Sequence, residues 1–457
     1  MGLKTTREIA DFVHDFSFDQ LPAGLVTHVK DIVTGYMSST LAGSILPIGR
    51  VATEYARLQQ SSQQAGVFGG GFKTTLEAAA AANATMAHAT ELEDVAFPEG
   101  LYTLTVLAPV FAIAEHLHLT GREAIEAFVL GYEVAGKLGV ACADAGAKGW
   151  MLSAVFASVG NAAAAAKLFK LDRDQTLNAL SIGASQGTGI VKQAGMGAHT
   201  FEAGFAARNG ICAATLAKLG LDGAPGILEG VGGMTDLIGG VTNFDLVDGF
   251  RTAEIGIRKY PCCGLLQRNI DGMSDLIAEQ KLTIDAVESV EVEVNHTFAM
   301  YMKYAEPTTA AQTRFSIEHA IAACFLERPV FLASFTDEAA HDPRYMEIRR
   351  KVKMTVHPEW ERGYFPQPAI ITVRLKDGRT IKRECVFARG DAGHPASRAD
   401  ISGKYQGAID FVGVLSQPQA DKAARMIATL DDVNDVSELT TIFAFPDRLE
   451  KPERRVA

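Results

Sequence analysis

A run of acidic side chains follows an alanine-rich segment early in the chain and is the first candidate for chemistry. The segment from Asn83 to Asp94 ends with Glu91, Glu93 and Asp94 within four residues, and His88 lies one turn before them. On a continuing helix Glu91 and Asp94 would share one face. Anions at a helix C-terminus are disfavoured by the helix dipole, and crowding them raises the pKa of at least one carboxyl group, which suits proton transfer near neutral pH. The alternative is a solvated acidic helix end.

The elements that position such a site belong to a large, acidic, folded protein. The 457 residues suffice for two or more domains, and 47% hydrophobic with 21% charged residues is ordinary for a globular chain. A net charge of −11 argues against nucleic acid and anionic membranes as partners, but it is compatible with a small anionic substrate in a local basic pocket. No apolar run reaches the length of a membrane span, and the N-terminus reads as an amphipathic helix rather than a signal peptide.

Cysteine and histidine spacing predicts neither a metal nor a cofactor. The six cysteines are scattered without zinc or redox spacing, which is typical of reduced thiols in a cytoplasmic protein. His116 and His118 are two apart on a predicted helix and point in different directions. The glycine runs at 69–71 and 230–233 lack the strand and spacing of a nucleotide-binding loop.

Helical periodicity dominates the chain from its start to residue 258. Apolar residues recur at helical spacing over 31–42 and 76–90, Thr120 to Glu123 forms a capping box, and residues 154–168 are apolar nearly all round, as in a buried helix. The abundance of alanine and glycine indicates helices whose backbones approach closely.

The pattern changes near Tyr260. Residues 287–294 alternate apolar and polar, as in a half-buried strand, and 370–375 and 380–387 flank Asp377-Gly378, a hairpin signal. Helical segments at 269–280 and 317–326 lie between the strands, and helical signals return after residue 395. We therefore predict a mainly α protein, in which an all-α domain of residues 1–258 plus 396–457 carries an inserted α+β lid domain of residues 259–395. Ligand sites tend to form between such domains.

In order and spacing, the chain's motifs resemble those of the MmgE/PrpD family of 2-methylcitrate dehydratases, cis-aconitate decarboxylases and an iminodisuccinate epimerase. The motifs that carry the resemblance are residues 83–94 (in the family NG-x-x-AH-x-x-DFDD), Val129 to Val134, Ser185-Gln186-Gly187, Ala206 to Gly210, Tyr260 to Cys263, Ile270-Asp271 and Phe315 to Ile317. The resemblance implies a helical domain with an α+β lid, a homodimer, a cleft between the domains, and cofactor-independent chemistry at the carbon next to a carboxylate.

The departures from the family pattern affect the residues expected to move protons and bind carboxylates. Leu101, which Tyr102 follows, and Phe97 each stand where the family has a histidine, and the family GFH motif becomes Gly149-Trp150-Met151. His199 replaces a family lysine, and Glu202 and Gln267 replace two further histidines. The first acid of the DFDD segment is Glu91. A less cationic and drier pocket favours a substrate with fewer carboxylates or with an apolar body.

The candidate catalytic residues are Glu91, Asp94, Tyr102 and His199. His199 and Glu202 are three apart, so on a helix the carboxylate orients the imidazole and raises its basicity. Tyr102 would donate a proton where the family has a histidine; its alternative is a packing role. For the pair His199–Glu202 the alternative is a solvated surface pair.

The candidate substrate-binding residues come from the same motifs, and they are Gln186, Lys192, Gln267, Arg268, Trp150 and Met151. Arginine suits a carboxylate because its guanidinium binds two oxygens at once. We expect a lyase or isomerase that abstracts a proton next to a carboxylate or carbonyl of a small organic acid or derivative. The alternative is that the protein is not an enzyme but a non-catalytic homologue that acts as a binding or scaffold protein.

Overall fold

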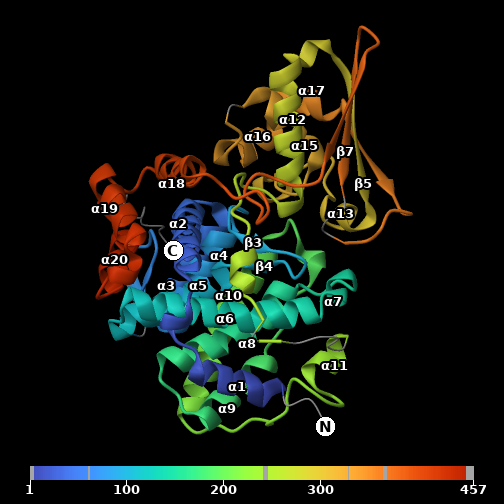
Figure 1. Cartoon of the computed structure of the whole chain (residues 1–457). Helices are drawn as coiled ribbons and strands as arrows, with labels where there is room; N and C mark the ends of the chain where they lie inside the picture. Colours follow the sequence, from blue (N-terminus) through green and yellow to red (C-terminus); the bar gives the residue numbers. More distant parts are fainter. Residues whose placement is uncertain are drawn as a thin grey trace.

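Most of the described chain is helical, as Figure 1 shows, so the prediction of a mainly α fold is confirmed. The computed structural model describes residues 5–59, 62–239, 245–246, 248–327, 329–363 and 368–448. The helices up to residue 239 are α1 (Thr5–Asp15), α2 (Ala23–Ser44), α3 (Pro47–Leu58), α4 (Leu76–His88), α5 (Leu104–Leu117), α6 (Gly121–Ala141), α7 (Asp144–Ala147), α8 (Leu152–Leu168), α9 (Arg173–Ala184), α10 (Gly197–Lys218) and α11 (Met234–Ile238).

The long helices pack at short distances along their small residues. α4 contacts α2, α5 and α10, and α8 contacts α5, α6, α9 and α10. A Cβ atom on Gly160 of α8 would lie 2.3 Å from the carbonyl oxygen of Gly131 in α6, so only glycine fits this crossing. The predicted capping box at Thr120 is present at the start of α6. The alanine and glycine content thus sets the close helix packing.

Two short hairpins interrupt the region that periodicity predicted to be helical. They are β1 (Ala65–Val67) with β2 (Phe72–Thr74), and β3 (Val95–Ala96) with β4 (Leu101–Tyr102). In the second hairpin Val95 pairs with Tyr102, so the hairpin brings the segment after the acidic run back against the end of α4. An alternating pattern of apolar and polar residues cannot be recognised in strands of two or three residues, so the sequence did not predict these hairpins.

The predicted strands form one mixed sheet together with a further strand, β6, in the order β6-β5-β7-β8. Its strands are β5 (Val287–Asn295), β6 (Val352–His357), β7 (Ala369–Leu375) and β8 (Thr380–Cys385). β5 pairs with β6 in parallel and with β7 antiparallel, and β7 pairs antiparallel with β8. Gly378 has φ +88°, as the predicted Asp377-Gly378 turn requires.

Helices lie between and beside these strands in the chain, and Figure 1 shows them with the sheet above the helical body. They are α12 (Gln267–Gln280), α13 (His296–Tyr301), α14 (Ala310–Thr313), α15 (Ile317–Leu326), α16 (Asp337–His341) and α17 (Pro343–Arg349). α12 contacts β7 and β8, and α15 contacts β6. Val290, Val292 and Val294 of β5 are buried, whereas Glu291 and Glu293 are half-buried.

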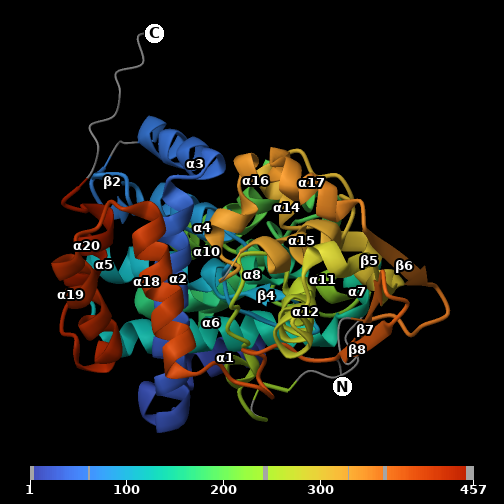
Figure 2. The same ribbon diagram turned by 90° about the horizontal axis from the view of Figure 1, so that it is seen from above.

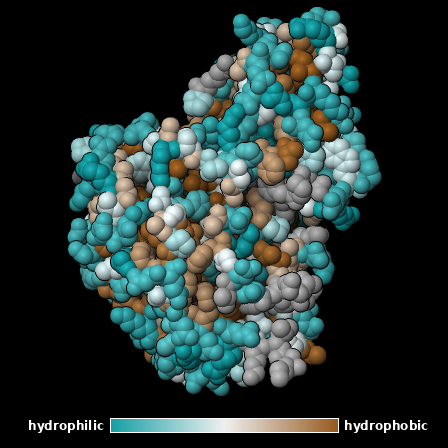
Figure 3. Space-filling model, in the orientation of Figure 1, coloured by the Kyte–Doolittle hydropathy of each residue, from teal (hydrophilic) through white to brown (hydrophobic). Residues whose placement is uncertain are grey.

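The last helices return to the helical body, where Figure 2 shows them beside α2. They are α18 (Arg398–Val412), α19 (Gln417–Ala428) and α20 (Ser437–Ala444), and α18 and α19 both contact α2. The division into residues 1–258 plus 396–457 and residues 259–395 stays a prediction. On the face drawn in Figure 3 most side chains are polar and apolar ones form scattered groups. Within the described ranges, no helix combines the length and apolar character needed to cross a membrane.

Candidate active site

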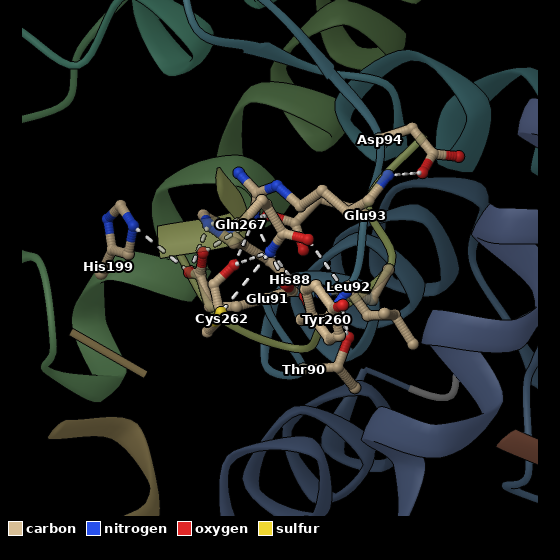
Figure 4. A network of polar contacts seen from close by, with 12 residues as sticks. His88, Thr90, Glu91, Leu92, Glu93, Asp94, His199, Tyr260, Cys262 and Gln267 are labelled. Atoms are coloured by element: carbon tan, nitrogen blue, oxygen red, sulfur yellow. Dashed lines mark hydrogen bonds and ion pairs between the residues drawn. The ribbon is translucent and has the colours of Figure 1, made fainter. Parts of the chain in front are cut away.

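Three titratable side chains meet inside the protein, from the end of α4, the turn after it and the first turn of α10 (Figure 4). Nε2 of His88 lies 3.3 Å from Oε1 of Glu91, and Nε2 of His199 lies 3.8 Å from the same oxygen. The two imidazole ring centroids are 4.5 Å apart. Each of the three residues is at most 3% exposed. The structure therefore brings together Glu91 and His199, and it adds His88; we call these three residues the cluster.

The backbone after α4 turns Glu91 back against His88. α4 ends at His88, and the amide of Glu91 donates to the carbonyl of His88 at 3.0 Å. Glu91 has φ +52°, a left-handed conformation that is uncommon for residues other than glycine and recurs at functional sites. The helix therefore does not continue through the acidic run, and the expectation that Glu91 and Asp94 share one helix face is wrong.

Asp94 points away from His199 (Figure 4). Its Oδ1 accepts hydrogen bonds from Nζ of Lys404 in α18 at 2.6 Å and from the amide of Arg258 at 3.0 Å. A Cβ atom on Gly35 of α2 would lie 2.3 Å from its Oδ2. Burial raises the pKa of Asp94 in spite of the Lys404 charge. The hydrogen bonds tie α18 and the backbone at Arg258 to the turn after α4, and the absence of a side chain on Gly35 leaves room for the carboxylate. A role for Asp94 in proton transfer stays a prediction.

Arg258 bridges two of the acids, and sequence reasoning missed it. Its Nη1 donates to Oε2 of Glu91 at 3.0 Å and to Oε1 of Glu93 at 3.2 Å. Its guanidinium carbon lies 5.4 Å from the ring centroid of Tyr102. Burial alone would lower the pKa of Arg258, but the carboxylates of Glu93 and Glu91 hold it above its ordinary value. The only signal in the sequence is the basic pair Arg258-Lys259 in front of a motif, which carries no spacing information about distant acids.

Glu91 and Glu93 share this guanidinium but differ in protonation. Burial raises the pKa of Glu93 to about 8; Arg258 opposes the shift and Glu91 adds to it. Burial would also raise the pKa of Glu91, but the close contact and charge of His88, then the charges of Arg258 and His199, hold it well below its ordinary value. Neighbouring carboxyl groups whose pKa values are driven apart provide one ionised and one protonated group near neutral pH, the pattern of acid–base pairs.

His199 is oriented by Glu202, as predicted from their spacing. Both lie in α10, and Nδ1 of His199 is 3.4 Å from Oε2 of Glu202. The other oxygen of Glu202 accepts from the amide of Ile190 at 2.8 Å, which fixes the carboxylate. A carboxylate on Nδ1 fixes the tautomer that leaves Nε2 free to accept a proton.

Tyr102 lies beside the cluster and lines one cavity with Trp150 and Met151. The ring centroid of Tyr102 is 4.6 Å from that of His88, and burial raises the pKa of Tyr102 well above its ordinary value, so its hydroxyl stays protonated. Together with Arg258, these three residues line a cavity of about 30 Å³. This volume holds a few water molecules, so side chains must move before an organic acid can enter.

Gln267 is fully engaged in the turn before α12. Its Oε1 accepts from the amides of Lys259 and Tyr260 at 3.1 and 2.9 Å, and its Nε2 donates to the carbonyls of Tyr260 and Cys262 at 2.8 and 3.1 Å. Such contacts hold the turn that carries Arg258. The predicted role of Gln267 in substrate binding stays a prediction, and its amide has these bonds to break first.

The structure does not bring the other predicted binding residues to the cluster. Gln186 donates through Nε2 to the carbonyl of Ile182, and Lys192 is exposed in the short 3-10 helix Val191–Gln193. Arg268 is buried, lines a separate cavity of about 190 Å³, and donates to the carbonyl of Val386 at 3.4 Å. In the described ranges, no hydrogen bond or ion pair joins Gln186 or Lys192 to the cluster.

The cluster also offers ligands that a divalent cation accepts. His88, Glu91 and His199 each offer one possible ligand atom, and these three atoms lie within 4.8 Å of one another. Two imidazoles and a carboxylate are a ligand set that divalent transition metals accept. Spacing in the sequence did not reveal this set, because its members come from two helices and a turn. Arg258 places a positive charge 3.0 Å from the second oxygen of Glu91, which disfavours a cation beside it.

Comparison with known proteins agrees with the motifs on which this site is built. The MmgE/PrpD N-terminal domain matches residues 7–247 and the MmgE/PrpD C-terminal domain matches residues 260–432. The chain belongs to the MmgE/PrpD family. MmgE/PrpD relatives with similar sequences include cis-aconitate decarboxylase of Aspergillus terreus, 23% identical over 96% of both chains. The cis-aconitate decarboxylases of Homo sapiens and Mus musculus are 23% and 22% identical over 98% of this chain and 96% and 95% of their own lengths.

Proposed function

We propose that this MmgE/PrpD protein is a lyase that acts on a small organic acid by moving a proton next to a carboxylate or carbonyl group. One observation carries the proposal. Both ring nitrogens of His88 and Oε1 of Glu91 lack a well-aligned hydrogen bond within the described chain, although all are buried and they face His199. Buried polar atoms are normally satisfied, so a group of unsatisfied acids and bases is kept for another purpose, such as proton transfer.

The geometry supports separate roles for the base and the acid. His199 takes the proton through Nε2, Glu202 holds its ring from the other side, and ionised Glu91 stabilises the imidazolium that forms. Tyr102 keeps its proton until negative charge develops beside it, and then protonates the leaving group or the carbon. In an elimination, the base removes a proton from carbon, a double bond forms, and the protonated hydroxyl leaves as water.

The names of the relatives support decarboxylation as a second form of the same chemistry. In a decarboxylation the electrons of the broken carbon–carbon bond pass to the carbanion as carbon dioxide leaves, and the acid protonates that carbon. Isomerisation shares the carbanion but returns the proton. We favour a lyase because the curated relatives are decarboxylases. The lining by Phe97, Trp150 and Met151 supports a substrate with fewer carboxylates than cis-aconitate, or with an apolar body.

Three further properties belong to the proposal: a homodimer, cytoplasmic location, and chemistry without a cofactor or metal. The homodimer follows from family resemblance, and light scattering of the purified protein tests it. Cytoplasmic location accords with the six cysteines, all of which are free thiols. The third is tested below by chelation.

An unbiased metabolite screen tests the proposal. Purified protein is incubated with a metabolite extract and with a panel of small organic acids, and mass spectrometry follows depletion and product formation. We expect loss of 18 or 44 mass units, for water or carbon dioxide, from at least one acid. If no acid is consumed, and none exchanges a carbon-bound proton with solvent, the protein is a non-catalytic homologue.

A further inference from the structure

Arg314 is a buried cation at the edge of the cluster. It lies between α14 and α15 and is 3% exposed. Its carbonyl oxygen accepts a hydrogen bond from the amide of Cys263 at 3.1 Å, and the ring of the next residue, Phe315, lies 5.9 Å from the ring of His199. The backbone therefore holds Arg314 beside the segment that carries Arg258, and its neighbour Phe315 lies against the proposed base.

The charge of Arg314 is not paired with a carboxylate of the described residues. Nη1 donates to the carbonyl of Ala310 at 2.8 Å, Nε has no hydrogen-bond partner, and no carboxylate oxygen of the described residues lies within 4.0 Å. Burial lowers its pKa to about 10, and Glu91 is the acid that opposes this shift most, so the guanidinium stays protonated at neutral pH. A buried cation without a paired anion is strongly unfavourable, and binding of an anion removes that cost.

Two other buried arginines have the partners that Arg314 lacks, a carboxylate in one case and a second carbonyl in the other. Arg258 pairs with Glu91 and Glu93. Arg349, in α17, donates to the carbonyls of Pro307 and Ala340 at 3.3 and 2.9 Å. Among the described residues Arg314 has neither a carboxylate nor a second carbonyl as a partner, so its charge is left to bind a ligand.

We propose that Arg314 binds a carboxylate group of the substrate. The inference rests on the proposed function, because it takes the substrate to be an organic acid. With Nη1 held by Ala310, the Nε side of the guanidinium offers directed hydrogen bonds that a carboxylate accepts. Arg314 is next in the chain to Phe315, whose ring contacts His199, and its charge interacts with that of Glu91, so a carboxylate bound there would lie close to the cluster. One uncompensated cation also predicts recognition of one carboxylate rather than three.

Crotonate and crotonamide test this site because they have the same shape and differ in charge. Their binding to the full-length protein is measured by ligand-observed NMR titration. We expect wild type to bind crotonate more tightly than crotonamide, and Arg314→Met to bind crotonate about 10- to 100-fold more weakly with crotonamide unchanged. Arg314→Lys should retain part of the preference. Arg349→Met, a buried arginine with backbone partners, should keep wild-type crotonate binding.

The melting temperature separates binding from a structural role. Replacing an uncompensated buried charge by an apolar side chain of similar size should leave the melting temperature of Arg314→Met unchanged or higher, whereas Arg349→Met strands two carbonyls and should lower it. If Arg314→Met does not fold, Arg314→Gln, which keeps a donor, takes its place in the titration.

The proposal is overturned if wild type does not prefer crotonate, or if removal of the Arg314 charge leaves that preference intact. A protein that binds crotonate through Arg314 but transforms no organic acid would contradict the proposed function and leave the binding site standing.

Discussion

Nε2 of His199 in α10 lies 3.8 Å from Oε1 of Glu91 after α4, although about a hundred residues separate them in the sequence. The contact depends on how closely the two helices pack. A Cβ atom on Gly204 of α10 would lie 2.6 Å from the carbonyl oxygen of Ala81 in α4. Small residues along this crossing therefore set the distance between the proposed base and its carboxylate.

Asp94→Asn should lower the melting temperature markedly and turnover only slightly. Asp94 and Lys404 form a buried pair at 2.6 Å, and removal of one partner leaves the other charge buried, at a cost of about 3–5 kcal/mol. Thermal unfolding of Asp94→Asn, Lys404→Met and the double variant measures this. The double variant should be more stable than the sum of the single losses predicts. A large loss of turnover with an unchanged melting temperature would instead assign Asp94 to the chemistry.

Glu93→Gln should remove a pH dependence of stability. Burial, opposed by Arg258 and helped by Glu91, holds the pKa of Glu93 at about 8 in the folded protein, against 4.5 for the free side chain. His88 and His199 also face this group. Between these values the folded state keeps a proton that the unfolded state has released, so wild-type stability falls as pH rises, by at most about 1.4 kcal/mol per pH unit.

The melting temperature of Glu93→Gln relative to wild type should therefore rise from about pH 5 to about pH 8 and level off above that. Glu384→Gln, on the exposed side of β8, serves as the control and should follow wild type at every pH. Parallel curves for Glu93→Gln and wild type would mean that Glu93 is ionised in the folded protein across this range.

Exhaustive chelation should leave both activity and melting temperature unchanged. Arg258 already supplies positive charge to Glu91, and a divalent cation at the cluster would be repelled by it. Addition of Zn²⁺ tests the same point from the other side. A rise in melting temperature with Zn²⁺ in wild type that is absent in His199→Ala would identify His88, Glu91 and His199 as a metal site.

cis-Aconitate and 2-methylcitrate should be poor substrates. Leu101, Met151 and Gln267 stand where family motifs carry histidines, and the Gln267 amide is held by backbone groups. Each lost hydrogen bond to a buried anion costs about 1–3 kcal/mol, so turnover should fall by orders of magnitude relative to a typical member. Steady-state kinetics on both acids checks this, and efficient conversion of either one would refute it.

The elements whose pattern is local were predictable from the sequence. The buried helix α8, the helix α15 and the β7–β8 hairpin with its Asp377-Gly378 turn follow from periodicity and turn chemistry within each segment. The mixed pairing of β5 with β6 and β7 joins segments far apart in the chain, which periodicity does not encode.

The site was predictable only in part, for the same reason. Family motifs and helical spacing found Glu91 and the His199–Glu202 pair. They did not find the end of α4 at His88, because the alanine-rich pattern continues past it while the backbone turns. Arg258 was missed because its partners are set by the tertiary fold rather than by spacing.

The most direct test of the account is exchange of carbon-bound protons with solvent deuterium, measured by mass spectrometry on the acids that the screen identifies. His199→Ala should slow exchange by about 10²–10⁴-fold, the usual contribution of a positioned base, with little change in melting temperature. His357→Ala is the matched control, because His357 pairs with Glu359 at 2.8 Å on β6, away from the cluster. Wild-type exchange in His357→Ala and its loss in His199→Ala are the predicted result; equal exchange in all three proteins would contradict the assignment of His199 as the base.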